Sequence, residues 1–531
     1  NTLASVKTWG NSEGAGRVGL TLNSITNKKT NVWKQTHDWT AKVIYLFGIH
    51  KSFIKKVLTD FIISRIKAEL PFIPNEEKGA LFDLLGQFLI STDSQKAFIL
   101  RGYAGTGKTS VVSALVNALE KLRQPCVLLA PTGRAAKVIA KYAQRPAYTI
   151  HKYIYRQKQL GADSFSLATN LHKHTLFIVD EASMISASRQ TVSAQTGNPA
   201  FGTGSLLDDL IRYVYSGEGC SLLLLGDDAQ LPPVGSQESP ALDTDYIRGY
   251  GLNVSNFCLT QVARQALDSG ILANATRLRR LLQDSPHTTI DDLQPTFGND
   301  VINLQGSDIV ETLEKSYRDA GDEDTLIITR SNKRTNLYNQ GVRARILWKE
   351  DAISSGDRLM VSKNNYFWTQ DYDDLPFLAN GDTLEVVRLR NEHEMYGFRF
   401  AEASLRSIDY DWEIDALLWL DTLTTDTPEQ NYPLQQTLFS RIAEDYPEIR
   451  NRKELVKKVY ESEYYNALQV RFAYAVTCHK AQGGQWKHVY IDAGNIALDE
   501  ERMSNPQERR EYIRWLYTAL TRATEKVYWI G

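Results

Sequence analysis

Apolar runs without polar alternation recur along this chain, and each run ends in a short polar loop. The first lies at 97–100, and similar runs follow at 127–130, 176–179 and 222–225. A strand that is apolar at every position is buried on both faces, which is typical of a parallel sheet covered by helices. Open sheets of this kind bind ligands in the loops at the carboxyl ends of their strands. The pattern therefore predicts an α/β core with its chemistry at one edge of the sheet.

The loop after the first run holds the most specific motif of the chain. Residues 102–109 read Gly-Tyr-Ala-Gly-Thr-Gly-Lys-Thr and match G-x-x-x-x-G-K-[ST], with a strand pattern before them and a helix pattern after them. The glycines let backbone N–H groups turn onto a phosphate, Lys108 supplies positive charge, and the Thr109 hydroxyl can hold Mg²⁺. We therefore expect a nucleoside triphosphate to be bound by Gly102, Ala104, Gly105, Thr106, Gly107, Lys108, Thr109 and Ser110.

Carboxylates and an amide follow two of the later apolar runs. Asp180 and Glu181 come directly after 176–179, and Gln230 lies in the loop that follows 222–225. Asp180 is placed to bind Mg²⁺ together with Thr109, and Glu181 to orient or deprotonate the attacking water. The Gln230 amide can donate to a γ-phosphate oxygen and accept from water. We therefore expect a nucleoside triphosphate, Mg²⁺ and phosphate hydrolysis at this edge of the sheet.

The second half of the chain repeats the design. A buried run at 325–329 ends in a polar loop, and another at 472–478 leads into a turn that ends in glycine. Short alternating strands between them predict a small β-barrel inserted in a second α/β domain, and two short stretches on either side of a turn at 161–163 predict a β-hairpin inserted in the first. The predicted boundaries are an extension at 1–57, a first domain at 58–264 with its hairpin near 152–172, a second domain at 265–382 and 469–531, and the barrel at 383–468.

The composition bears on the ligands and on the cellular compartment that fit this chain. The 531 residues carry a net charge of −2, so a nucleic acid would need a locally basic groove rather than overall charge. No window reaches the roughly 18 apolar residues of a membrane span, and no secretion signal is recognisable, so we expect a cytoplasmic protein without membrane insertion. The four cysteines are far apart and form no C-x-x-C pair, which favours buried thiols over a metal or disulfide site.

Two charged stretches bear on ligand binding. Residues 137–158 are basic and interleaved with tyrosines, the mixture of phosphate charge and stacking rings that single-stranded nucleic acid favours. Residues 409–430 are acidic, and we expect them to form a solvated outer face.

Eight stretches in order resemble the motifs of superfamily 1B helicases, closest to the RecD-like and Dda-like DNA helicases. They are 102–110, 130–137, 149–151, 179–184, 225–234, 259–265, 475–485 and 517–523. The resemblance implies two RecA-like (P-loop NTPase) domains with ATP between them, in a monomeric motor that moves 5′ to 3′. Its expected partners are single-stranded DNA and junctions of single- and double-stranded DNA, with the hairpin splitting the duplex and the barrel as an accessory module.

The resemblance also implies roles for individual residues. Arg264, near the domain seam, and Arg522, from the second domain, are expected to reach the γ-phosphate and to complete the catalytic set of Lys108, Asp180, Glu181 and Gln230. Gly483 is expected at the nucleotide. Glu77 stands where the family has an adenine-reading glutamine, and because a carboxylate cannot donate to a ring nitrogen, base selectivity stays open. The expected DNA contacts are Pro131, Thr132, Arg134, Thr149, His151 and Tyr155 in the first domain and Thr329, Ser331, Thr477, His479 and Lys480 in the second.

Two other functions remain open from the sequence. The same motor could remodel RNA or an RNA–DNA hybrid, since the 2′-OH is what distinguishes these substrates locally. A nucleotide-gated binding module without unwinding is the other alternative, although the intact Glu181, Gln230 and Arg522 argue against it. No nuclease carboxylate cluster stands out, so we expect no nuclease activity.

Overall fold

The computed structural model describes residues 51–157, 164–188, 200–262, 269–284, 291–370, 372, 375, 377–425, 430–494 and 504–530. Most of the predicted extension at 1–57 lies outside these residues, as does Arg264. The end of the extension, 51–57, begins helix α2 (Lys51–Ala68).

The first domain is built on a six-stranded sheet with the strand order β3-β2-β6-β8-β1-β9, in which all neighbours are parallel. Its strands are β1 (Lys96–Gly102), β2 (Cys126–Ala130), β3 (Ala147–Thr149), β6 (Leu176–Val179), β8 (Ser221–Gly226) and β9 (Asn253–Leu259). Every predicted apolar run of this domain lies in one of these strands, so the expected parallel sheet is confirmed.

Helices cover both faces of this sheet, as the unbroken apolar runs predict. Helix α2 packs with α3 (Glu76–Ile90), α4 (Lys108–Lys121) and α5 (Gly133–Ala143) in the core of one face. The core of the other face contains α6 (Ile150–Ile154), α7 (Leu206–Ser216) and α8 (Thr244–Arg248). Because β6, β8 and β1 are parallel neighbours in the sheet, the loops at their carboxyl ends lie along the same edge.

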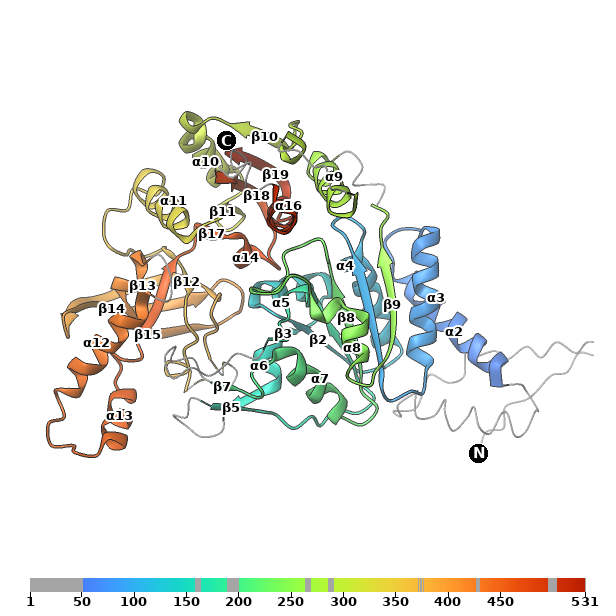
Figure 1. Cartoon of the computed structure of the whole chain (residues 1–531), viewed down its shortest axis with the longest axis horizontal. Helices are drawn as coiled ribbons and strands as arrows, with labels where there is room; N and C mark the ends of the chain where they lie inside the picture. Colours follow the sequence, from blue (N-terminus) through green and yellow to red (C-terminus); the bar gives the residue numbers. More distant parts are fainter. Residues whose placement is uncertain are drawn as a thin grey trace, which may run out of the picture.

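The second domain contains a five-stranded parallel sheet with the order β10-β19-β18-β11-β17 (Figure 1). Its strands are β10 (Val301–Leu304), β11 (Thr325–Thr329), β17 (Ala475–Thr477), β18 (Trp486–Asp492) and β19 (Ala523–Ile530). Its helices are α9 (Gly270–Asp284), α10 (Ile309–Asp319), α11 (Asn332–Arg345), α14 (Cys478–Ala481) and α16 (Pro506–Leu520). Tyr103, Ala229 and Leu231 of the first domain share an apolar cluster with α9 and α16, so these two helices lie at the domain seam.

A closed five-stranded barrel interrupts the second domain and lies at the left of Figure 1, in orange. Its strands are β12 (Arg358–Val361), β13 (Thr383–Met395), β14 (Phe398–Ser407), β15 (Glu413–Trp419) and β16 (Leu468–Phe472). Helices α12 (Asn431–Ala443) and α13 (Arg452–Tyr460) lie between β15 and β16 in sequence and pack on the barrel. The predicted insertion at 383–468 therefore leaves out β12 and most of β16.

The predicted hairpin of the first domain consists of β4 (Tyr155–Gln157) and β5 (Ser164–Leu167), which are antiparallel. A third short strand, β7 (Ala200–Phe201), adds to β5 in parallel. The Phe165 ring of β5 lies 4.5 Å from the Tyr366 ring of the segment between β12 and β13, so the hairpin packs on the barrel side of the molecule.

The remaining helices are short 3-10 turns: η2 (Ala182–Met184), η3 (Pro240–Leu242), η5 (Asp291–Leu293), η6 (Gly306–Asp308) and η7 (Leu420–Thr424). Among the helices described, none combines the length and the apolar character needed to cross a membrane.

Candidate functional site

The phosphate-binding loop joins β1 to α4 with the geometry that its glycines predict. Gly105 and Gly107 have φ angles of +74° and +87°, a region that other residues rarely adopt, and Gly107 directly precedes α4. The first N–H groups of a helix lack intrahelical partners and attract anions. The Lys108 ammonium donates to the carbonyls of Gly102 and Tyr103, and it lies 3.9 Å from Asp227. The lysine is therefore held over the loop.

Asp180 and Glu181 lie at the end of β6, at the same edge. Burial and the neighbouring Glu181 charge raise the pKa of Asp180, although the Lys108 charge acts in the opposite direction. Its Oδ1 accepts from the Glu181 N–H at 2.9 Å. Glu181 has a φ of +51°, a left-handed conformation that costs a non-glycine residue about 1–2 kcal/mol.

The donor set fits a magnesium ion that also binds a nucleotide. Mg²⁺ keeps several waters and takes one or two protein oxygens plus substrate phosphates, which the Thr109 hydroxyl and the Asp180 carboxylate can supply. No cluster of three or more His, Cys, Asp or Glu suited to a metal is found among the residues described.

Arg522 approaches this edge from the second domain. It follows α16, is 4% exposed, and its Nη1 lies 4.0 Å from Glu181 Oε1. Its Nε donates to the Thr518 carbonyl and its Nη1 to the Gly484 carbonyl, at 3.1 and 3.2 Å. The guanidinium is therefore held rigidly across the seam, facing the first domain's carboxylate.

Gln230 lies after β8 and is buried. Its Oε1 has no hydrogen-bond partner among the described residues, which leaves a buried carbonyl oxygen available to a ligand. The neighbouring Asp227 is also buried, and burial raises its pKa. The sequence places Asp227 directly after β8, just as Asp180 follows β6, but it assigned Asp227 no role.

Glu77 is occupied by protein contacts. Its Oε1 accepts from the Thr260 N–H and hydroxyl at 2.8 and 2.7 Å, and its Oε2 accepts from the Gln261 N–H at 3.1 Å. A carboxylate can accept at both oxygens, which the amide of a glutamine cannot. Glu77 therefore fastens the segment that follows β9, and its contact with a nucleobase stays a prediction.

The residues of the first domain that are predicted to contact DNA differ in how deeply they are buried. Thr132 and Thr149 cap the amino ends of α5 and α6 with their hydroxyls. Tyr155 is 3% exposed and donates to the buried Asp209, so it lies inside the domain rather than at a surface. Burial lowers the pKa of His151 to about 4, so it is neutral at physiological pH. Pro131, next to Thr132, is partly exposed.

The predicted contacts of the second domain also divide. Thr329 is fully buried and bonded within its own loop, whereas Ser331 caps α11. Thr477 and His479 stay partly exposed at α14. The Lys480 side chain is exposed, and its ammonium donates to Asn380 Oδ1.

Gly483 brings the two domains into direct contact. Its φ is +77°, and a Cβ at this position would lie 2.7 Å from the Cβ of Ala135 in α5. Only glycine permits this approach. The turn after α14 therefore sits against the predicted DNA-binding helix α5, and a contact between Gly483 and nucleotide stays a prediction.

The barrel engages basic residues of the first domain. Asp382 lies 3.3 Å from Lys152, and Asp409 lies 3.5 Å from Arg134. Lys137 donates to the Ile408 carbonyl. Asp409 is 7% exposed, and burial raises its pKa, so the expectation of a solvated acidic face is wrong at this residue. We call Asp382 and Asp409 with Arg134 and Lys152 the barrel latch.

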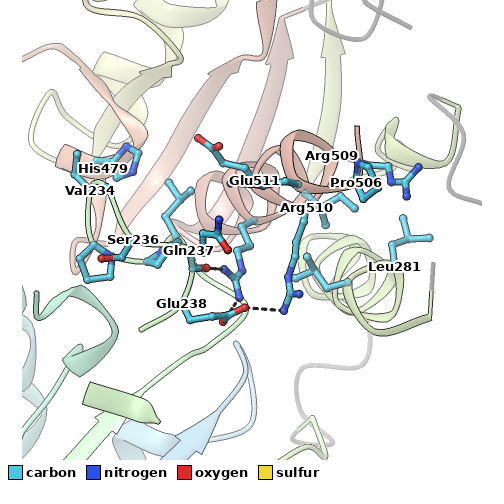
Figure 2. Close-up of a pocket in the computed structure, with 18 of the residues that line it drawn as sticks. Val234, Ser236, Gln237, Glu238, Leu281, His479, Pro506, Arg509, Arg510 and Glu511 are labelled. Carbon is cyan, nitrogen blue, oxygen red and sulfur yellow. Dashed lines mark hydrogen bonds and ion pairs between the residues drawn. The ribbon is translucent and has the colours of Figure 1, made fainter. Parts of the chain in front are cut away.

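A second seam feature is a pocket of about 800 Å³ that does not include the phosphate loop. Figure 2 shows it between the loop that holds Val234 to Glu238, the end of α9 at Leu281, and the start of α16. Glu238 of the first domain pairs with Arg510 and Arg514 of α16 at 3.0 and 2.8 Å. The pocket is therefore bridged by ion pairs between the domains.

Two family models match separate parts of the chain: an AAA domain at residues 88–194 and a UvrD-like helicase C-terminal domain at 472–530. The first covers the phosphate loop and the end of β6, and the second covers the segment from β17 to β19.

The individual proteins that match this chain have low sequence identity to it. An uncharacterized protein of Acanthamoeba polyphaga mimivirus is 22% identical over 513 residues, which cover 82% of this chain and 96% of that protein. The ATP-dependent RecD2 DNA helicase of Deinococcus radiodurans is 26% identical over 246 residues, which cover 44% of this chain and 27% of that protein. The crystal structure of a Bacteroides Pif1 helicase with ADP-AlF3 and single-stranded DNA has 16% identity and a TM-score of 0.44, with 86% of this chain and 92% of that chain covered.

Proposed function

We propose that this chain, which resembles the superfamily 1B helicases of the RecD/Pif1-like group, is an ATP-dependent DNA helicase that moves 5′ to 3′ along single-stranded DNA. The family models and the RecD2 relative confirm the resemblance. The observation that carries the proposal is the 4.0 Å approach of Arg522 to Glu181 across the domain seam. Phosphoryl transfer needs positive charge at the γ-phosphate. Because Arg522 supplies part of this charge from the second domain, hydrolysis depends on the relative position of the two domains. That dependence is what a motor requires.

Each residue at the domain seam has its own role in the proposed ATP hydrolysis. Lys108 offers charge to the β- and γ-phosphates, and Thr109 and Asp180 would hold Mg²⁺, which supplies charge neutralisation between those phosphates. Glu181 orients and deprotonates the attacking water, and Arg522 stabilises the charge that develops on the transferred group.

The DNA path is proposed to cross both domains at the same edge. Arg134 lies on α5, and His479 lies on α14, whose following turn contacts α5 through Gly483. Cationic side chains and aromatic rings such as these favour phosphates and stacked bases. The close approach of the two helices supports a single strand that touches both domains, so that domain movement would shift the strand.

Strand displacement tests the proposal directly. We expect the protein to unwind a 5′-tailed DNA duplex in the presence of ATP and Mg²⁺, and to leave a 3′-tailed duplex intact. Lys108→Ala should abolish both ATP hydrolysis and unwinding, because the loop then lacks its cation. Unwinding from 3′ tails alone would overturn the polarity.

ATP hydrolysis stimulated by single-stranded RNA but not by DNA would favour the RNA-remodelling alternative instead. DNA-stimulated hydrolysis without strand displacement would favour a nucleotide-gated binding module. Labelled DNA should remain uncut in the same reactions, and cleavage with Mg²⁺ would contradict the expected absence of nuclease activity.

The barrel latch predicts a change in DNA affinity. Replacing Asp382 and Asp409 together by Asn should tighten single-stranded DNA binding about fivefold at low salt, since roughly 1 kcal/mol of competition for Arg134 and Lys152 is removed. Fluorescence anisotropy with a labelled oligonucleotide measures the Kd, and the gain should shrink as salt rises.

A control variant separates the latch from net charge. Asp415→Asn with Glu413→Gln removes two exposed barrel carboxylates whose ion-pair partners, Arg390 and Arg406, belong to the barrel itself. If this control tightens DNA binding as much as the latch variant does, overall charge accounts for the effect and the latch plays no part.

A further inference from the structure

Tyr517 belongs to α16 of the second domain, but its hydroxyl lies inside the first. The side chain is 1% exposed. Its oxygen accepts from the N–H of Ala104 at 2.8 Å and donates to Asp227 Oδ2 at 2.7 Å. Ala104 is part of the phosphate loop, and Asp227 lies 3.9 Å from the Lys108 ammonium. One hydroxyl therefore joins the second domain to the loop and to the carboxylate beside its lysine.

Both partners of this hydroxyl depend on it. Asp227 is buried, and its other oxygen accepts from the Ala229 N–H at 3.0 Å. Burial raises the pKa of Asp227 and that of Tyr517, so both groups sit where unpaired polar atoms are costly. Without the hydroxyl, a loop N–H and a carboxylate oxygen would lose their partner, and the loop and Asp227 would be free to shift relative to α16.

The same helix delivers Arg522. Tyr517 and Arg522 are both fixed to the last turn of α16, where Arg522 Nε bonds the Thr518 carbonyl. The position of Arg522 relative to the phosphate loop is therefore set at Tyr517, because this is where the turn touches the loop. A misplacement of about 1 Å at a reacting centre can cost about 100-fold in rate.

We propose that Tyr517 is a positioning residue for ATP hydrolysis: its hydroxyl aligns the phosphate loop and the Lys108–Asp227 pair with α16, so that Lys108 and Arg522 meet the same phosphate. The inference rests on the proposed ATPase function. Tyr517 acts through the loop, Asp227 and Arg522, and touches no reacting atom in this arrangement.

The chain contains a close match for Tyr517 at a distant site. Tyr474 is 2% exposed, donates to Asp357 Oδ1 at 2.9 Å and accepts from the Arg358 N–H at 3.2 Å. Tyr474→Phe therefore removes the same pair of hydrogen bonds, to a buried aspartate and a backbone N–H, at the base of the barrel.

A second control tests whether the loss of any hydrogen bond between α16 and the first domain lowers ATP hydrolysis. Thr518 accepts from the Leu231 N–H at 2.9 Å, which is another hydrogen bond between α16 and the first domain but not with the phosphate loop. Thr518→Val removes this side-chain bond but keeps the Thr518 backbone carbonyl that accepts from Arg522 Nε, and it leaves Tyr517 in place.

The experiment is steady-state ATP hydrolysis with saturating single-stranded DNA for the wild type and for Tyr517→Phe, Tyr474→Phe and Thr518→Val, with the Tm of each. For Tyr517→Phe we expect kcat to fall about 10- to 100-fold and KM for ATP to change less than about threefold. For both controls we expect kcat within about twofold of wild type, although their Tm falls as well.

Two outcomes would overturn the inference: a Tyr517→Phe kcat within about twofold of that of Tyr474→Phe, or an equal loss of kcat in Thr518→Val. A wild type that hydrolyses no ATP would instead contradict the proposed function itself.

If Tyr517→Phe does not fold, Asp227→Asn replaces it and should show the same fall in kcat. Where the single variants do fold, the double variant should be within about twofold of the slower one, since both changes break one link. A double variant that multiplies the two losses would also overturn the inference.

Discussion

Replacing Arg522 by lysine is expected to lower the DNA-stimulated kcat for ATP hydrolysis by about 10³-fold or more. The guanidinium bonds the Thr518 and Gly484 carbonyls while it faces Glu181 at 4.0 Å, and a single ammonium cannot keep these directions together. Because the charge acts on the transition state, the Kd of a fluorescent ATP analogue should change less than about threefold. Steady-state hydrolysis and equilibrium binding measure the two quantities.

Arg514→Lys is the matched control for this variant. Arg514 is also a buried arginine that crosses the seam, but it lies within α16 and bonds the Gln237 carbonyl and Glu238 at the pocket. We expect the kcat of the Arg514→Lys variant to stay within about threefold of the wild-type kcat. If both variants lose activity equally, Arg522 acts by holding the domains together, and a loss below about tenfold in Arg522→Lys would remove it from the catalytic set.

The sequence predicts the first sheet and its phosphate loop because their determinants are local. The run at 97–100, the glycine pattern and Lys108 are neighbours in the chain, and the structure places them in β1, a loop with two positive φ angles, and the start of α4. An apolar run specifies a strand buried on both faces wherever its neighbours lie. The same reasoning places carboxylates after β6 and β8.

Contacts between distant segments could not be predicted in this way. The hydroxyl of Tyr517 meets Asp227 from the other domain, and nothing in a helix sequence says that one tyrosine will reach across a seam. Asp409 shows the converse: an acidic stretch is typical of a solvated face, but the barrel carries this residue against Arg134. Tyr155 stands among basic residues, and yet Asp209 holds it inside.

The strands that close the barrel could not be predicted for a related reason. Strands β12 and β16 are short, and β12 pairs with β13 on one side and with β16 on the other. Closure therefore depends on pairing residues near 360 with residues near 470, and such long-range pairing leaves no periodic signal in either segment.

Replacing Glu181 by glutamine is expected to lower kcat about 10²- to 10⁴-fold while binding of ATP and single-stranded DNA is kept. Glutamine has the same shape and can still face Arg522, but it cannot take a proton from water. The Glu181 side chain takes no part in the φ of +51° or in the bond from the Glu181 N–H to the Asp180 carboxylate, so the turn should persist in the variant. Single-turnover hydrolysis measures the chemical step, and anisotropy measures DNA binding.

Glu238→Gln is the control for this change. Glu238 is also a glutamate at the seam, paired with Arg510 and Arg514 at the pocket, so the control removes a charge of the same kind away from the phosphate loop. We expect kcat within about threefold of wild type for the control. A Glu181→Gln enzyme that keeps more than about a tenth of wild-type kcat would mean that another group activates the water. The role of Glu181 would then be limited to its contact with Arg522 across the seam.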